Sequence, residues 1–93
     1  MDLKLQDKVI LVTGGSKGVG LGIVDSLIKE NAIPVIVTRN RDSTLPIVQN
    51  YQNKGKKISF AIAELTNPRQ CEEAVSGILK QYGRIDGLVN NAG

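Results

Sequence analysis

The sequence predicts a three-layer α/β fold in which a parallel β-sheet carries helices on both faces. Three observations predict it: short runs of β-branched residues recur along the chain, amphipathic helical patterns separate them, and a glycine-rich turn joins the first run to the first helical pattern. Parallel strands need a crossover between them, and strands that are apolar throughout are typical of a sheet covered on both faces. The expected order along the chain is therefore β-α-β-α-β-α-β.

The expected strands are short and strongly apolar. They span residues 9–13, 34–38 and 58–62, and a fourth begins at residues 88–90. Because crossover connections are right-handed, the first three strands should lie in the order 3-2-1, with the fourth on the other side of the first. The carboxyl ends of the first and fourth strands should then border one crevice, where the sheet order reverses.

The helices have different strengths of signal. The first follows Gly20 and ends near Asn31, and the second is weaker, beginning at Asp42 or Ser43 and ending at Gly55. The third has clear terminal signals, which are a capping Asn67, Pro68 in the first turn, Gln70 to return a capping-box bond, and Gly83 to close the helix.

The glycine-rich turn reads Thr13-Gly-Gly-Ser-Lys-Gly-Val-Gly20 and lies directly between a strand and a helix. This context is the one that a phosphate-binding turn requires. Gly14 would let the chain turn off the strand, Gly18 would let a pyrophosphate approach the backbone, and Gly20 would let the helix pack closely on the sheet. The alternative is a turn that serves chain geometry only. A Walker-type loop is excluded, because Leu21 and Gly22 stand where Lys and Ser or Thr are needed.

The turn motif Thr-Gly-x-x-x-Gly-x-Gly, together with Asn90-Asn-Ala-Gly93, resembles the short-chain dehydrogenase/reductase family. The resemblance extends over residues 8–93, and residues 1–8 and 32–36 also resemble sugar dehydrogenases of the L-fucose type. It implies a Rossmann-type doubly wound parallel sheet. It also implies an NAD(P)-dependent oxidoreductase that transfers a hydride between a nicotinamide cofactor and a small alcohol or carbonyl substrate.

The resemblance also implies where the cofactor binds. Glu64 and Leu65 would lie at the adenine, although the family usually has Asp where this chain has the longer Glu64. Asn90 or Asn91 would tie the central strands together through amide hydrogen bonds. The cofactor-binding residues expected at the phosphates and riboses are Gly14, Gly15, Ser16, Lys17, Gly18, Val19, Gly20, Asn91, Ala92 and Gly93.

The residue after the second strand distinguishes the two nicotinamide cofactors. An NAD site offers Asp or Glu to the ribose hydroxyls, and an NADP site offers Arg to the 2′-phosphate. This chain has Arg39 there, with Lys17 across from it, so we expect NADP(H). NAD(H) stays possible because Asp42 could reach the ribose, and the alternative for Arg39 is a solvated loop cation.

The sequence contains no catalytic residues of the family pattern Tyr-x-x-x-Lys. Tyr51 has Lys54 three residues later and Tyr82 has Asp86 four residues later, so both are expected at the surface or in helix packing. The catalytic serine of the family would follow a fifth strand. We therefore expect residues 1–93 to be the N-terminal part of a single NAD(P)-binding domain, truncated after the fourth strand. Alone, this part should be inactive and should fold poorly, because the fourth strand would form an exposed edge.

Two other interpretations are a non-catalytic module that binds or senses NADP(H), and an inactive truncated product. The resemblance implies a homo-oligomer for the full-length protein, which is not expected of this segment.

The composition and charge of the chain argue against several other functions. With 93 residues, a net charge of +3 from scattered Lys and Arg, and three aromatic residues, nucleic-acid binding is not expected. A chain with no histidine and one cysteine is not expected to hold a metal, and no stretch is apolar enough for a membrane span or a signal peptide. The expected location is cytoplasmic.

Overall fold

The computed structural model describes residues 4–14 and 18–91, and its elements alternate as the sequence predicts. All strand pairs are parallel, and the sheet order is β3-β2-β1-β4, which confirms the predicted strand order. In chain order the elements are β1 (Val9–Thr13), α1 (Gly18–Lys29), β2 (Ile33–Thr38), α2 (Arg41–Asn53), β3 (Ser59–Ile62), α3 (Pro68–Tyr82) and β4 (Gly87–Asn90).

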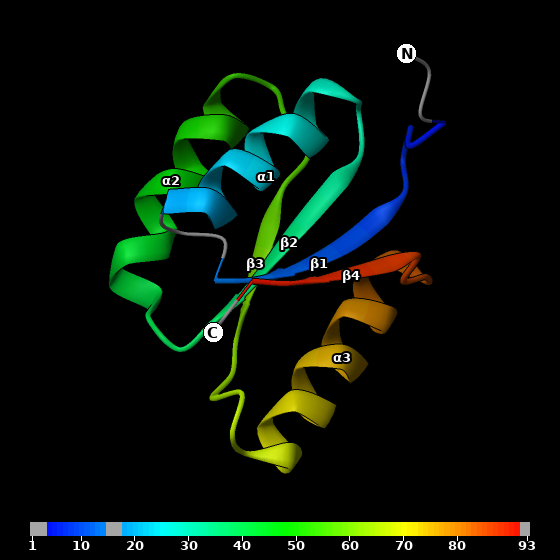
Figure 1. The fold of residues 1–93 in the computed structure, drawn as a ribbon. Coiled ribbons are helices and arrows are strands. Elements are labelled where there is room, and N and C mark those ends of the chain that lie inside the picture. Colours follow the sequence, from blue (N-terminus) through cyan, green and yellow to red (C-terminus); the bar gives the residue numbers. More distant parts are fainter. Residues whose placement is uncertain (1–3, 15–17, 92–93) are drawn as a thin grey trace.

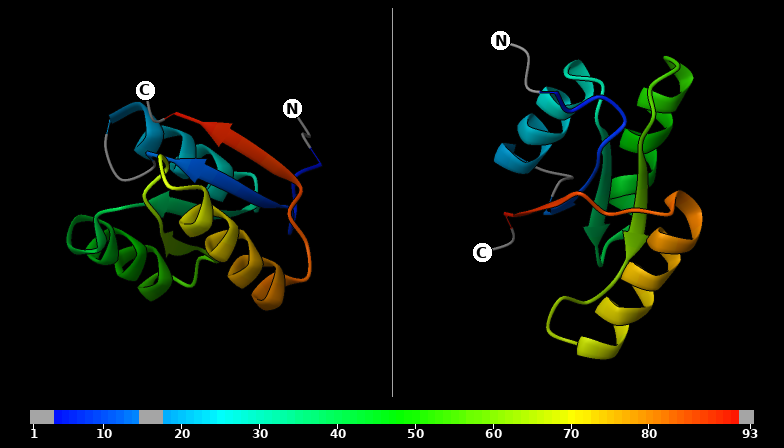
Figure 2. Two further views of the ribbon diagram at one scale, coloured as in Figure 1. Left: turned by 90° about the horizontal axis from the view of Figure 1, so that it is seen from below. Right: turned by 90° about the vertical axis from the view of Figure 1, so that its right-hand side faces the viewer.

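The sheet lies between two helical layers (Figure 1). Helices α1 and α2 cover one face, and α3 covers the other, as the views from below and from the side also show (Figure 2). This is the arrangement that right-handed crossovers produce when the chain first moves outward from β1 to β3 and then returns to the other side of β1. The chain is therefore a doubly wound sheet with its reversal between β1 and β4.

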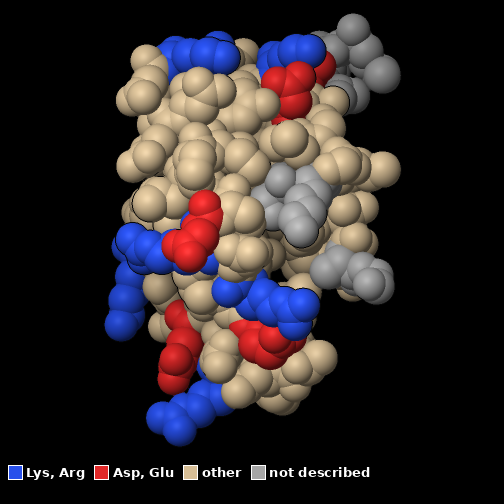
Figure 3. Space-filling model, turned by 90° about the vertical axis from the view of Figure 1, so that its left-hand side faces the viewer, with Lys and Arg blue, Asp and Glu red and all other residues tan. Residues whose placement is uncertain are grey.

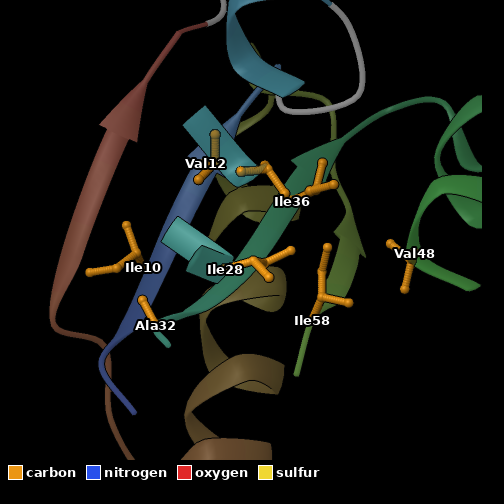
Figure 4. Close-up of a cluster of buried hydrophobic side chains, with 8 residues drawn as sticks. Ile10, Val12, Ile28, Ala32, Ile36, Val48 and Ile58 are labelled. Atoms are coloured by element: carbon orange, nitrogen blue, oxygen red, sulfur yellow. The ribbon is translucent and has the colours of Figure 1, made fainter. Parts of the chain in front are cut away.

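Successive side chains of β1 divide between two apolar layers. Ile10 and Val12 pack toward α1 and α2, where Ile28, Ile36 and four other buried residues complete the cluster (Figure 4). The alternate side chains of the strand, Val9 and Leu11, face α3 and join a second cluster that includes Ile78. Burying one such side chain fully contributes about 1.5–3 kcal/mol, so these two layers are the main source of stability.

Element boundaries differ from the predictions where tertiary contacts extend or shorten an element. β2 begins one residue early, at Ile33, because its N–H donates to the Lys8 carbonyl over 2.7 Å. α2 begins at Arg41 with Asn40 as its N-cap, whose side chain accepts from the Ser43 N–H at 3.1 Å. The expectation that Asp42 or Ser43 begins this helix was therefore wrong, because Asn40 has the extended backbone that an N-cap needs.

α3 has most of the predicted terminal signals. Asn67 caps it by accepting from the Gln70 N–H at 3.2 Å, and Gly83 ends it in the left-handed region at φ 75°. The capping-box bond predicted for Gln70 is wrong. Its side-chain oxygen instead accepts from the Glu64 backbone N–H at 2.7 Å, so this side chain holds the loop after β3 rather than the helix start.

Asp86 joins β4 to β1 at the amino ends of the strands. Its carboxylate accepts from the Val9 N–H at 2.8 Å, and its own N–H donates to the Val9 carbonyl over 2.8 Å. Arg84 donates to both carboxylate oxygens at 2.7 Å. The hydrogen bond from Arg84, and then that from Val9, hold the pKa of Asp86 below its usual range. The negative charge therefore stabilises this junction at neutral pH.

Candidate cofactor site

The carboxyl ends of the four strands meet at one edge of the sheet, because the strands are parallel. Thr13 and Asn90 are paired in register at the ends of the adjacent strands β1 and β4. The predicted cofactor residues follow these ends: Gly14, Gly18, Val19 and Gly20 after β1, Arg39 after β2, Glu64 and Leu65 after β3, and Asn91 after β4. The other predicted residues, Gly15, Ser16, Lys17, Ala92 and Gly93, lie outside the described residues.

Three glycines of the turn meet different geometric demands. Gly14 and Gly18 have positive φ angles of 67° and 50°, which L side chains rarely adopt. Among the described residues, no atom lies within 4 Å of where a Cβ on Gly18 would stand, so this backbone faces open space. Gly20 is buried, and a Cβ there would overlap the Gly14 carbonyl and lie 2.8 Å from the Asn91 side-chain nitrogen. Gly20 therefore permits the close approach of α1 to the end of β1.

The Thr13 hydroxyl links β1 to β4 at the crevice. It donates to the Asn90 side-chain oxygen at 3.0 Å and accepts from the Asn91 backbone N–H at 2.9 Å. The sequence predicted amide hydrogen bonds between the central strands here, and the structure supplies Thr13 as their common partner. The sequence analysis missed Thr13, although a hydroxyl in the last position of a buried strand is a usable signal.

A cleft of about 420 Å³ lies at the ends of β2 and β3. Buried Val37 and Ala63 and half-exposed Leu65 supply apolar surface, while Arg39 and Glu64 stand beside it. Larger hollows of about 560 and 550 Å³ border α3, but they contain none of the predicted cofactor residues. A cleft with apolar surface and a few placed polar groups is the usual form of a small-molecule site.

Arg39 and Glu64 form an ion pair across this cleft, with Arg39 Nη1 and Glu64 Oε2 3.4 Å apart. The Thr66 hydroxyl donates to the other carboxylate oxygen at 3.3 Å. The hydrogen bond from Arg39, followed by that from the Thr66 backbone N–H, lowers the pKa of Glu64. The carboxylate is therefore ionised at neutral pH. No local pattern predicts this pair, since its members lie 25 residues apart.

Both tyrosines lie away from the crevice. Tyr82 and Ser59 share a hydrogen bond of 2.7 Å between their hydroxyls, and Ser59 is the first residue of β3, at the amino edge of the sheet. Tyr51 donates to an Asp25 carboxylate oxygen at 2.9 Å, which joins α2 to α1. The sequence predicted helix packing or surface positions for these residues, and their contacts are of that kind.

Charges of both signs are interspersed on the face shown in Figure 3. Over the part of the chain that the structure describes, several charges form surface pairs, such as Lys57 with Asp7 at 3.2 Å and Arg69 with Glu73 at 3.2 Å. That face therefore does not present a one-signed patch of the kind that binds a polyanion. Among the described helices, none combines the length and the apolar character needed to cross a bilayer.

The doubly wound sheet, with a glycine-rich turn leading into a helix at the point of reversal, defines a Rossmann-type fold. The chain belongs to the short-chain dehydrogenase family, whose model matches residues 8–93.

Several relatives resemble the whole of this chain. It is 34% identical over 93 residues to the 3-oxoacyl-(acyl-carrier-protein) reductase FabG of Chlamydia pneumoniae, covering 100% of this chain and 38% of the reductase. It is 35% identical to the sorbitol-6-phosphate 2-dehydrogenase of Klebsiella pneumoniae, covering 98% of this chain and 32% of that enzyme.

Solved structures show the same resemblance. L-Sorbose reductase from Gluconobacter frateurii, complexed with NADPH and L-sorbose, matches with a TM-score of 0.91 and 32% identity, over 100% of this chain and 36% of that one. A 2-keto-3-deoxy-D-gluconate dehydrogenase from Streptococcus agalactiae matches with a TM-score of 0.86 and 31% identity, over 96% of this chain and 34% of that one. The chain therefore spans about a third of the length of these relatives.

Proposed function

We propose that this chain binds NADP(H) and forms the cofactor-binding part of an oxidoreductase that acts on a small alcohol or carbonyl compound. The observation that carries the proposal is the glycine turn at the reversal point, where Gly18 presents open backbone at the start of α1. The family membership and the NADPH in the related L-sorbose reductase structure support it. When bound, the nicotinamide would accept or supply the hydride of the reaction.

The residues present fit the phosphates and riboses of such a cofactor. The N-terminus of a helix offers unpaired N–H groups and the positive end of the helix dipole to an anion. In α1 as described, the first turn has no acidic residue that would repel a phosphate. Residues 14–20 would hold the pyrophosphate, and Asn91, held by Thr13, would lie beside a ribose.

The cleft at the ends of β2 and β3 fits the adenosine end of the cofactor. Leu65 offers apolar surface to a flat ring, and Arg39 follows the end of β2, where a 2′-phosphate would lie. Asp42, the acid that could serve an NAD ribose, lies in the first turn of α2, where its charge stabilises the helix start. These positions favour NADP(H) over NAD(H).

Catalysis needs a proton donor near the nicotinamide. The hydroxyl of Tyr51 is hydrogen-bonded to Asp25 and that of Tyr82 to Ser59, and Tyr82 lies at the amino edge of the sheet, remote from the crevice. We therefore propose that the catalytic serine and the Tyr-x-x-x-Lys pair are not among residues 1–93, which form part of a single NAD(P)-binding domain. Residues 1–93 should then supply the groups that bind the cofactor but no proton donor for hydride transfer.

Calorimetric titration with NADPH tests the binding proposal, using Gly18→Val as the variant and Gly22→Ala as the control. A side chain at Gly18 would fill the open space that a pyrophosphate needs, whereas a Cβ on Gly22 also meets nothing but lies outside the turn. We expect Gly18→Val to weaken binding about tenfold or more, equivalent to about 1.4 kcal/mol, and Gly22→Ala to leave it unchanged. Gly18→Ala repeats the test with less steric bulk if the valine variant does not fold. Unchanged affinity in a folded variant contradicts the proposal.

A further inference from the structure

The Arg39–Glu64 pair is built asymmetrically. The side chain of Arg39 is 80% exposed, whereas that of Glu64 is 36% exposed. Glu64 is also held at three other points: its N–H donates to Gln70, its carbonyl accepts from the Asn67 N–H, and its carboxylate accepts from Thr66. Glu64 is therefore the fixed member of the pair, and Arg39 is the member that can move.

The position of Glu64 bears on what Arg39 can offer a ligand. In the structure the Glu64 carboxylate accepts a hydrogen bond from one terminal guanidinium nitrogen of Arg39 and offsets its positive charge at the cleft. A 2′-phosphate carries between one and two negative charges, so it must share or displace this carboxylate. A ribose with a free 2′-hydroxyl brings no charge and meets no such opposition.

We propose that Glu64 is a specificity-determining residue, which draws Arg39 across the cleft and so reduces the preference of the site for a 2′-phosphate over a 2′-hydroxyl. This inference rests on the proposed NADP(H) function and adds a moderating role to it. The pair would make the site accept both cofactors while still favouring the phosphorylated one. Arg39 alone would select more strongly.

The length of Glu64 is part of the argument. Its carboxylate reaches Arg39 with one oxygen while the other stays on Thr66. Aspartate is shorter by one carbon–carbon bond, about 1.5 Å, and from the same fixed backbone it would withdraw from Arg39. Glu64→Gln therefore removes the charge at constant length, and Glu64→Asp keeps the charge but shortens the reach. Glu64→Gln should release Arg39, and Glu64→Asp should weaken its contact with Arg39.

The test measures dissociation constants by calorimetry for NADPH and NADH, and for adenosine 2′,5′-bisphosphate and adenosine 5′-monophosphate as smaller probes. It compares the wild type, Glu64→Gln, Glu64→Asp, Arg39→Gln and the Arg39→Gln/Glu64→Gln double variant. We expect Glu64→Gln to raise the preference for the 2′-phosphorylated member of each pair about two- to fivefold, the size typical of an exposed ion pair. Glu64→Asp should change it in the same direction, and the effect of Glu64→Gln should largely vanish without Arg39.

Two results would overturn the inference while the proposed function stands. One is an unchanged preference in Glu64→Gln and Glu64→Asp, although both bind nucleotide. The other is an equal effect of Glu64→Gln with and without Arg39, which would mean that the carboxylate acts on the phosphate directly. Absence of any nucleotide binding by the wild type would overturn the proposed function together with this inference.

Discussion

Gly20 and Gly22 lie two residues apart in α1, and we expect opposite responses when each is replaced by alanine. At Gly22 the new Cβ meets no atom within 4 Å, so the substitution acts only through helix propensity. Alanine in a helix interior is favoured over glycine by about 0.5–1 kcal/mol. Gly22→Ala should therefore stabilise the fold, with a rise in Tm of about 2–8 °C for a domain of this size.

At Gly20 the same propensity gain is opposed by a steric overlap. The new Cβ would overlap the main-chain carbonyl of Gly14 and approach the Asn91 side-chain nitrogen to 2.8 Å. The Asn91 amide can move, but the Gly14 carbonyl belongs to the turn that connects β1 to α1, so α1 must shift. Overpacking of this kind costs about 1–3 kcal/mol, and a main-chain obstacle places it toward the upper end.

Because the propensity gain is common to both variants, it cancels in their difference. The free energy of unfolding of Gly20→Ala should therefore lie about 1–3 kcal/mol below that of Gly22→Ala. Urea unfolding followed by far-UV circular dichroism measures both, and equal slopes with denaturant would show that the comparison is sound. If Gly20→Ala is stabilised as much as Gly22→Ala, the close approach of α1 to the end of β1 is not present, and the reasoning is refuted.

Substitutions at three other residues test the site and its support. Thr13→Val should lower the free energy of unfolding by about 1–3 kcal/mol, because it leaves hydrogen-bonding groups of the neighbouring strand without a partner. Thr13→Ser keeps the hydroxyl and should therefore retain most of the wild-type stability. Thermal melts compare the two variants. Asp86 has a lowered pKa in the fold owing to Arg84 and Val9, so its contribution to stability is present above its unfolded pKa and is lost as the pH falls through the folded value. The Tm of the wild type should therefore fall more between pH 5 and pH 2 than that of Asp86→Asn, and parallel pH profiles would contradict this. Arg39→Asp should reverse the order of NADPH and NADH affinities, with a loss for NADPH of about tenfold to hundredfold; calorimetry that finds NADH bound equally or better by the wild type would show that Arg39 does not recognise the phosphate.

Features that depend on neighbouring residues and on chain handedness could be predicted from the sequence. Apolar runs long enough for one buried strand fixed β1 and β2, and Asn67 and Gly83 marked the ends of α3 because caps act within one helical turn. The strand order followed from the handedness of crossover connections, which is the same for every chain of L-residues. The glycine turn was recognisable because its spacing reflects backbone geometry that side chains would obstruct.

Which polar groups meet depends on the three-dimensional arrangement of the strands and loops. Thr13 joins Asn90 across 77 positions of sequence, and Arg39 meets Glu64 across 25, so no local pattern identifies the partner in either contact. Gln70 shows how two possible partners compete for one side chain. Its spacing from Asn67 predicts a capping box, yet its side chain accepts a hydrogen bond from the loop after β3. The choice depends on where the sheet places that loop. Long side chains have several partners within reach, and the register of distant strands decides which partner is present.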